Sequence, residues 1–222
     1  MGAASVPRRF EWQLPAALIV LSVVPSAAGI ARLAELARGA TITAANARFF
    51  AMPLPAVLHL ITVIPFCILG ALQFAPSFRR RHRGWHRAAG RVLVACGLVA
   101  ALTGLGMTLT YPWPAGDGVA LYAERLVVGS AMLISILLAV NAIRRRDFVS
   151  HGAWMTRAYA LGMGAGTQVL THLPYFILVG TPTVPARAVM MGAGWVINVV
   201  VAEWVIRRRV SRVAGVAVPA LS

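Results

Sequence analysis

Four histidines lie at the borders of long apolar segments or within them, where their imidazoles could do chemistry. His59 and His172 are each about seven residues inside an apolar segment, and His86 and His151 each open one. Imidazole is costly at membrane depth and tends to face the interior of a helix bundle. Histidines on facing helices can ligate the iron of b-type haem without a covalent attachment sequence. We therefore expect haem iron between His59 and His172, and a second candidate pair in His86 and His151.

The same residues also allow a structural interpretation. His86 and His151 would then be solvated or would face lipid phosphates at the membrane surface, while His59 and His172 would form hydrogen bonds within the bundle. On this alternative the histidines transfer protons, bind anions or contribute to helix packing. His82 stands among arginines and is expected to be a loop residue beside anionic headgroups.

Arg157 and Glu203 are ionisable residues inside apolar segments, and both are predicted at a similar depth. A structural ion pair is the first interpretation, and a clamp for a haem propionate or another anion is the functional alternative. Arg157 is therefore included among the candidate cofactor-binding residues. Glu124 and Arg125 form a second candidate pair. Three further polar residues are expected to bridge helices by hydrogen bonds: Thr167, Gln168 and Asn198.

The composition is that of a membrane protein. Of the 222 residues, 59% are hydrophobic and 12% are charged, which is far more apolar than a soluble domain of this size requires. The net charge of +15 does not indicate nucleic-acid binding, because the arginines cluster at the ends of apolar segments, where they act as topology signals. Cys67 and Cys96 both fall inside apolar segments, which disfavours a disulfide or a metal site.

The apolar segments predict a single all-α membrane domain over residues 1–222, built as a bundle of six transmembrane helices. Each segment provides the roughly 20 residues needed to cross about 30 Å of hydrocarbon. Residues 31–38 are expected to lie at the membrane interface. The first span is expected to be retained, because its apolar run is longer than the core of a signal peptide. The six expected spans are residues 14–31, 52–74, 86–110, 119–143, 152–179 and 187–206.

The placement of arginine predicts the orientation. All 21 Lys and Arg residues are arginine, and fifteen of them would lie on the side of both termini, against four on the other side. Because cytoplasmic loops are enriched in basic residues, we expect both termini to be cytoplasmic. The expected location is the cytoplasmic (inner) membrane of a bacterium.

Five short motifs occur in order within residues 50–170 and together resemble a bacterial family of predicted multi-pass membrane proteins, catalogued as a domain of unknown function. The resemblance implies the class of protein and no particular activity. The motifs are Leu58-His59, Leu72-Gln73-Phe74, His86-Arg87-Ala88-Ala89-Gly90-Arg91, His151-Gly152-Ala153-Trp154-Met155-Thr156-Arg157 and Gly164-Ala165-Gly166-Thr167-Gln168.

In architecture alone, the predicted bundle is also similar to the cytochrome b561 group, which has six spans, cytoplasmic termini and haem-ligating histidines on its four central helices. The chain departs from that pattern, because its fourth predicted span has no histidine and its fifth carries two.

The leading hypothesis is a protein of the lipid bilayer that binds haem b in a histidine-lined site for transmembrane electron transfer. A quinone, another small redox molecule or a membrane subunit would be its partner, and nucleic acid would not. The alternative is a non-enzymatic bundle that acts as a small transporter or as an accessory or assembly subunit.

Overall fold

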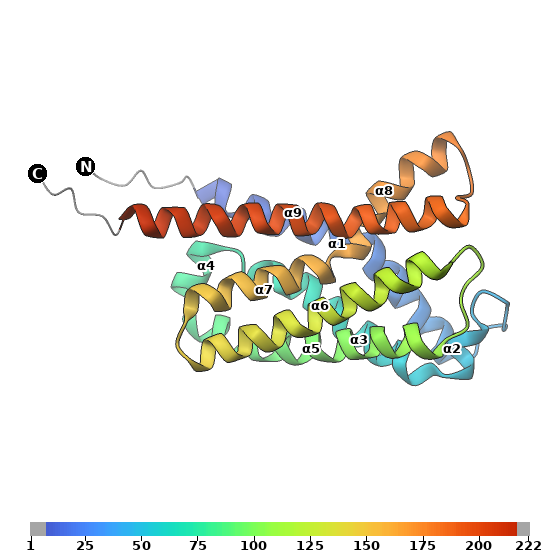
Figure 1. Cartoon of the computed structure of the whole chain (residues 1–222). Coiled ribbons are helices and arrows are strands. Elements are labelled where there is room, and N and C mark those ends of the chain that lie inside the picture. The colour runs from blue at the N-terminus through green and yellow to red at the C-terminus, as the bar shows by residue number, and fades with distance from the viewer. Residues whose placement is uncertain (1–7, 217–222) are drawn as a thin grey trace, which may run out of the picture.

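The computed structural model describes residues 8–216, and that range is almost entirely helical, with no strand (Figure 1). Residues 1–7 and 217–222, which the sequence analysis assigns to the same domain and to its cytoplasmic tails, lie outside the described residues. The described helices are α1 (Arg8–Arg38), α2 (Ala47–Ala51), α3 (Pro53–Leu72), α4 (Pro76–Arg81), α5 (Arg83–Thr110), α6 (Val119–Arg144), α7 (Phe148–Gly162), α8 (Gly164–Leu178) and α9 (Val184–Val216).

Five of the described helices are long and apolar enough to cross a membrane. They correspond to the first, second, third, fourth and sixth predicted spans, so the prediction of an all-helical membrane fold is confirmed. The first helix is longer than predicted, because α1 continues without interruption through residues 31–38. The five spanning segments are Trp12–Arg38, Pro53–Leu72, Arg83–Thr110, Val119–Arg144 and Val184–Arg209.

The prediction of one continuous helix over residues 152–179 is wrong. The chain forms two 15-residue helices instead, α7 and α8, which meet at Met163 and run in different directions (Figure 1). Carbonyl groups beside the break receive hydrogen bonds from other helices. Asn198 Nδ2 donates to the Ala160 carbonyl at 3.0 Å, and Cys67 Sγ donates to the Gly162 carbonyl at 3.6 Å. Such replacement donors make a broken helix tolerable at membrane depth.

Glycines let α8 press closely against its neighbours. A Cβ on Gly164 would lie 2.0 Å from Nε1 of Trp195, and a Cβ on Gly166 would lie 2.5 Å from the backbone oxygen of Leu21. On α9, a Cβ on Gly194 would lie 2.7 Å from Cγ of Gln168. Lipid tails are as apolar as leucine, so close packing and interhelical hydrogen bonds hold membrane helices together where burial of apolar surface cannot. The glycines therefore fix α8 between α1 and α9.

The packed core lies between α3, α5, α6 and α7 and is centred on Phe66, which is 1% exposed. A Cβ on Gly97 or on Gly162 would come within 2.8 Å of the Phe66 ring. Tyr159 packs beside Phe66 with ring centroids 5.8 Å apart and donates a hydrogen bond to the Cys67 carbonyl at 2.6 Å. Small residues and one aromatic pair thus join α3 to the neighbouring helices.

The outer surface of the bundle is apolar. Large hydrophobic side chains are exposed on every long helix, among them Val20, Ile61, Leu102, Ile134 and Val189. A soluble monomer rarely exposes so much continuous apolar surface. These side chains are therefore positioned to contact lipid.

One end of the molecule gathers the arginine clusters. Helix α4, the α6–α7 turn and the C-terminal part of α9 lie together at this end, with the two ends of the described chain (Figure 1). Asp147 caps α7 there, because its Oδ1 accepts a hydrogen bond from the Ser150 backbone at 2.9 Å. The predicted grouping of arginines at one end is confirmed, and we call this the arginine-rich end. It contains Arg79–Arg81, Arg144–Arg146 and Arg207–Arg209.

We expect Gly166→Ala to destabilise the protein by about 1–3 kcal/mol, because the new methyl group would meet the backbone of α1 at a distance that no rotamer change relieves. Gly152→Ala is the matched control, since nothing lies within 4 Å of a Cβ at that position. Thermal or chemical unfolding of the purified variants in detergent measures both effects. Equal stabilities would contradict the close approach of α8 to α1.

Candidate functional site

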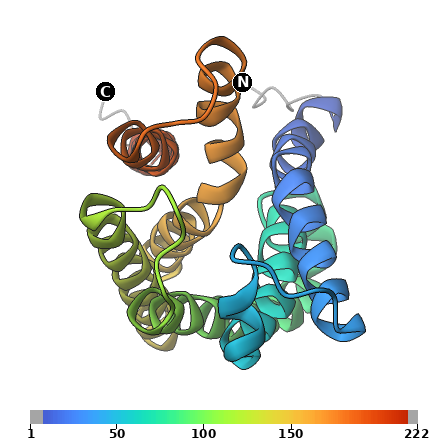
Figure 2. The ribbon, with the colours of Figure 1, turned by 90° about the vertical axis from the view of Figure 1, so that its right-hand side faces the viewer.

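A cavity of about 450 Å³ lies along the middle of the bundle. Viewed from the end that carries α2, helices α1, α3, α5, α6, α9 and α8 surround this central region, and each contacts the next (Figure 2). All of these helices contribute to the cavity lining, together with α2 and the break at Met163. The volume is within the range of small-molecule sites.

The cavity runs from the middle of the bundle to the end opposite the arginine clusters. Its inner wall includes Cys67, Gly162 and Met163, at the break between α7 and α8. Its other limit is the connection between α5 and α6 together with Arg48 of α2. We call this second limit the mouth.

His59 is the one candidate histidine that lines the cavity. Its Nδ1 lies 2.9 Å from the Ala100 carbonyl of α5 and 3.3 Å from Oγ1 of Thr103. A carbonyl oxygen only accepts hydrogen bonds, so Nδ1 carries the proton and Nε2 of the neutral ring keeps a lone pair. Among the described residues, no hydrogen bond to Nε2 is found. The ring is therefore held from behind and can accept a hydrogen bond from a ligand or bind a metal.

His172 lies on α8 and is not among the residues that line the cavity. Its Nδ1 is 2.7 Å from the Gln168 carbonyl, one turn earlier on the same helix. The described contacts do not join His172 to His59. The change of direction at Met163 explains this separation, because the predicted pairing took the depth of His172 from one straight helix over residues 152–179.

His86, near the start of α5, and His151, near the start of α7, both lie at the arginine-rich end and are close enough to interact electrostatically. Nδ1 of His151 is 3.0 Å from the Ala139 carbonyl, so this ring also donates through Nδ1. Nδ1 of His86 is buried without a hydrogen-bond partner among the described residues. The second predicted pair therefore consists of neighbours, although no direct contact between the two rings is found in the described part of the chain.

The predicted ion pair of Arg157 with Glu203 is confirmed. Nε and Nη2 of Arg157 donate to the two carboxylate oxygens at 2.6 and 3.0 Å, which joins α7 to α9 in a bidentate pair. The guanidinium also lies over the ring of Trp154, 4.5 Å from its centre. Arg157 does not line the cavity, and its charge is matched by Glu203.

The predicted polar bridges between helices are also confirmed. Oγ1 of Thr167 donates to Asn198 at 2.7 Å, and Nε2 of Gln168 donates to the Met191 carbonyl at 3.1 Å. Both bonds link α8 to α9. Asn198 also donates a hydrogen bond to the Ala160 carbonyl beside the break at Met163. These residues therefore hold the inner wall of the cavity in place.

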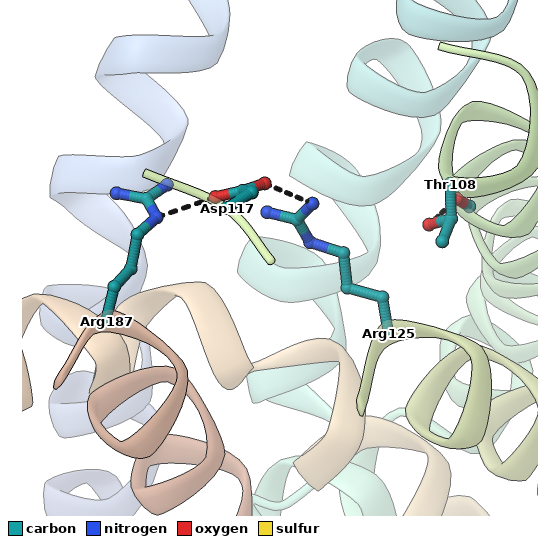
Figure 3. A network of polar contacts seen from close by, with 5 residues as sticks. Thr108, Asp117, Arg125 and Arg187 are labelled. Atoms are coloured by element: carbon teal, nitrogen blue, oxygen red, sulfur yellow. Dashed lines mark hydrogen bonds and ion pairs between the residues drawn. The ribbon is translucent and has the colours of Figure 1, made fainter. Parts of the chain in front are cut away.

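An ion network at the mouth differs from the predicted pairing of Glu124 with Arg125. Arg125 of α6 donates to Asp117 at 2.6 Å, and Arg187 of α9 donates to the other oxygen of Asp117 at 2.7 Å (Figure 3). The Asp117 side chain is only 2% exposed, so the carboxylate is buried, whereas the side chains of Arg125 and Arg187 are 29% and 34% exposed. Glu124 lies instead beside Gly192, whose Cβ would be 3.0 Å from Glu124 Oε1.

A sequence signal for this network does exist. Asp117 lies in the turn between the third and fourth predicted spans, and Arg187 begins the last predicted span, so both belong to the same boundary of the membrane. A comparison of the predicted depths of Asp117 and Arg187 would therefore have predicted their ion pair, in the same way as depth predicted the pair of Arg157 with Glu203.

The cavity offers limited metal chemistry. No group of three or more His, Cys, Asp or Glu side chains that could hold a metal ion occurs among residues the structure describes. A cofactor that needs one or two protein ligands is compatible with the lining, which holds the imidazole of His59, the thiol of Cys67 and three methionine thioethers. The methionines are Met107, Met132 and Met163.

Comparison with known proteins identifies one related family. A family model described as "Predicted membrane protein (DUF2306)" matches residues 56–206. No curated protein and no solved structure matches the chain significantly.

We expect Arg157→Gln and Glu203→Gln to be coupled in a double-mutant cycle by about 1 kcal/mol, because each substitution leaves the partner charge without its bidentate contact. Unfolding of the single and double variants in detergent measures the coupling. Arg145→Gln, at an exposed position, should change stability by less than about 0.5 kcal/mol. Additive effects of the two substitutions would show that the pair does not stabilise the bundle.

Proposed function

Since the chain belongs to the DUF2306 family of predicted membrane proteins, we propose that its central cavity binds a small amphipathic molecule within the bilayer. The observation that supports this function is the cavity itself, which extends between the five membrane-crossing helices and α8. The arginine-rich end supports an orientation with both termini cytoplasmic, and the proposed location is the cytoplasmic membrane of a bacterium. The mouth then faces the outer side of that membrane.

The distribution of side chains along the cavity favours an amphipathic ligand. The middle of the cavity is lined mainly by apolar residues, including Leu60, Val63 and Val128, and its polar side chains include His59 and Gln168. Charged residues line only the mouth, where Arg48 and Arg125 are found. An apolar body would occupy the middle, and a polar group would remain at the mouth. A quinone or another small redox molecule belongs to this class.

We expect Thr108→Trp to weaken ligand binding, because Thr108 of α5 lines the cavity near the mouth and an indole there would occupy part of the space that a ligand needs. Thr110→Trp is the matched control, since Thr110 is exposed two residues later on the same helix and does not line the cavity. Mass spectrometry of extracts from the proteins purified in dodecyl maltoside should find an amphiphile with the wild type and Thr110→Trp, and about tenfold less with Thr108→Trp. Equal amounts, or none from the wild type, would refute the proposed binding function.

Haem b is the second candidate ligand, and the specific observation that favours it is the hydrogen bond from His59 to Ala100. A backbone carbonyl that accepts the Nδ1 proton orients an imidazole for ligation through Nε2. When bound, haem b supplies one-electron transfer. His59 would hold the iron, with His172 as the partner expected from sequence or a cavity methionine as the partner that the lining favours. His86 and His151 are proposed as ligands of a second haem at the arginine-rich end.

The absorption spectrum of the purified protein tests the haem hypothesis. We expect a Soret band and reducible alpha bands that are lost in His59→Ala, because that substitution removes the imidazole in the cavity. His172→Ala tests the predicted bis-histidine pair, and an unchanged spectrum in that variant would assign the second position to another side chain. His82→Ala is the control and should retain the full spectrum, since His82 is exposed beside α4. A colourless wild-type protein would favour a transporter or an accessory subunit.

A further inference from the structure

The mouth of the cavity carries more positive than negative charge. Asp117 accepts from Arg125 and from Arg187, and its charge also reaches Arg48. Asp117 is the single carboxylate within ion-pair distance of any of these arginines in the described part of the chain. We call these four residues the mouth cluster. Within this cluster, one carboxylate faces three guanidinium groups. The carboxylate of Glu124 also interacts electrostatically with Arg125 but lies beside Gly192, outside the cluster.

Arg48 is the member of the mouth cluster whose charge has no direct counterion among the described residues. Its guanidinium lies over the ring of Phe49, 4.6 Å from the ring centre, and the guanidinium of Arg32 lies 4.7 Å from the same centre. Arg32 is paired with Glu35, so that carboxylate is already engaged. Partial burial lowers the pKa of Arg48, as do the positive charges of Arg125 and Arg32, whereas Asp117 raises it. An anion at this position would relieve the repulsion between Arg48 and Arg125.

The backbone around Arg48 is held in a defined position. Asn46 is buried, accepts a hydrogen bond from the Thr43 backbone at 2.6 Å and donates to the Thr41 carbonyl at 3.1 Å. Tyr111, at the end of α5, donates to the Met52 carbonyl on the other side of α2. The short helix that carries Arg48 is thereby tied to the mouth, and both Arg48 and Arg125 line the cavity.

We propose that the mouth cluster binds the phosphate or carboxylate headgroup of an amphiphile whose chain occupies the cavity, with Arg48 and Arg125 as the headgroup contacts. This inference rests on the proposed binding function and specifies its ligand class. Guanidinium groups match the geometry of both oxyanions and form charge-assisted hydrogen bonds with them. Asp117 holds Arg125 from one side and leaves its other donors available. The apolar lining behind the two arginines favours an anion that carries a chain over a free anion.

Titration of the full-length protein in dodecyl maltoside with four probes tests the headgroup. The probes are dodecyl phosphate, dodecanol, dodecyltrimethylammonium and inorganic phosphate, and calorimetry measures each dissociation constant. We expect dodecyl phosphate to bind at least about tenfold more tightly than the other three. Arg48→Gln should weaken dodecyl phosphate binding by about tenfold and leave dodecanol binding unchanged, which also shows that the variant is folded. Arg38→Gln is the matched control, because Arg38 is exposed at the end of α1 and does not line the cavity.

The other outcomes separate the two proposals. If dodecanol and dodecyl phosphate bind equally, or if Arg48→Gln changes neither affinity, the anionic headgroup is refuted and the binding function stands. If inorganic phosphate binds as tightly as dodecyl phosphate, the mouth cluster takes a free anion and the amphiphile is refuted. If none of the chain-bearing probes binds the wild type, the binding function fails and the headgroup inference fails with it.

Discussion

Backbone groups at membrane depth must find their hydrogen-bond partners within the protein, and this constraint determines the shape of the cavity. The chain breaks its fifth hydrophobic segment at Met163. Side chains from two other helices, Asn198 and Cys67, donate to carbonyl groups beside the break. Gly164 and Gly166 bring the next helix close enough to be held there. The segment that follows the break forms the inner wall of the cavity. Without these donors and glycines the segment would continue as a straight helix, and this wall would lie elsewhere.

The prediction from sequence succeeded where a single physical property decides the outcome. Hydrophobicity and length identify the five long helices, because a run of apolar residues in lipid has to form intrahelical hydrogen bonds. Depth along the predicted spans paired Arg157 with Glu203, since two opposite charges at one level of a bundle avoid the cost of being buried alone.

The prediction failed where the outcome depends on partners distant in sequence. A glycine-rich stretch is also common in straight membrane helices, so the break at Met163 depends on donors that the local sequence does not reveal. Because of that break, His172 lies on a helix with a different direction from the predicted one, and the expected contact with His59 is not found among the described residues. Arg125 stands next to Glu124 in sequence, yet Asp117 is the carboxylate that it contacts, because the turn after α5 folds back over the mouth.

Two of the ion clusters in the described bundle use arginine differently. At one level, Arg157 and Glu203 neutralise each other in a bidentate pair that joins α7 to α9, so an anion arriving there would have to displace a carboxylate. At the mouth, one carboxylate is divided between two arginines and a third remains without a direct counterion in the described part of the chain. The sequence suggested Arg157 as an anion-binding residue. Arg48 is the better candidate, because it has no direct counterion among the described residues and lines the cavity. A charge left unpaired beside an apolar cavity is costly, and binding an anionic amphiphile would remove that cost.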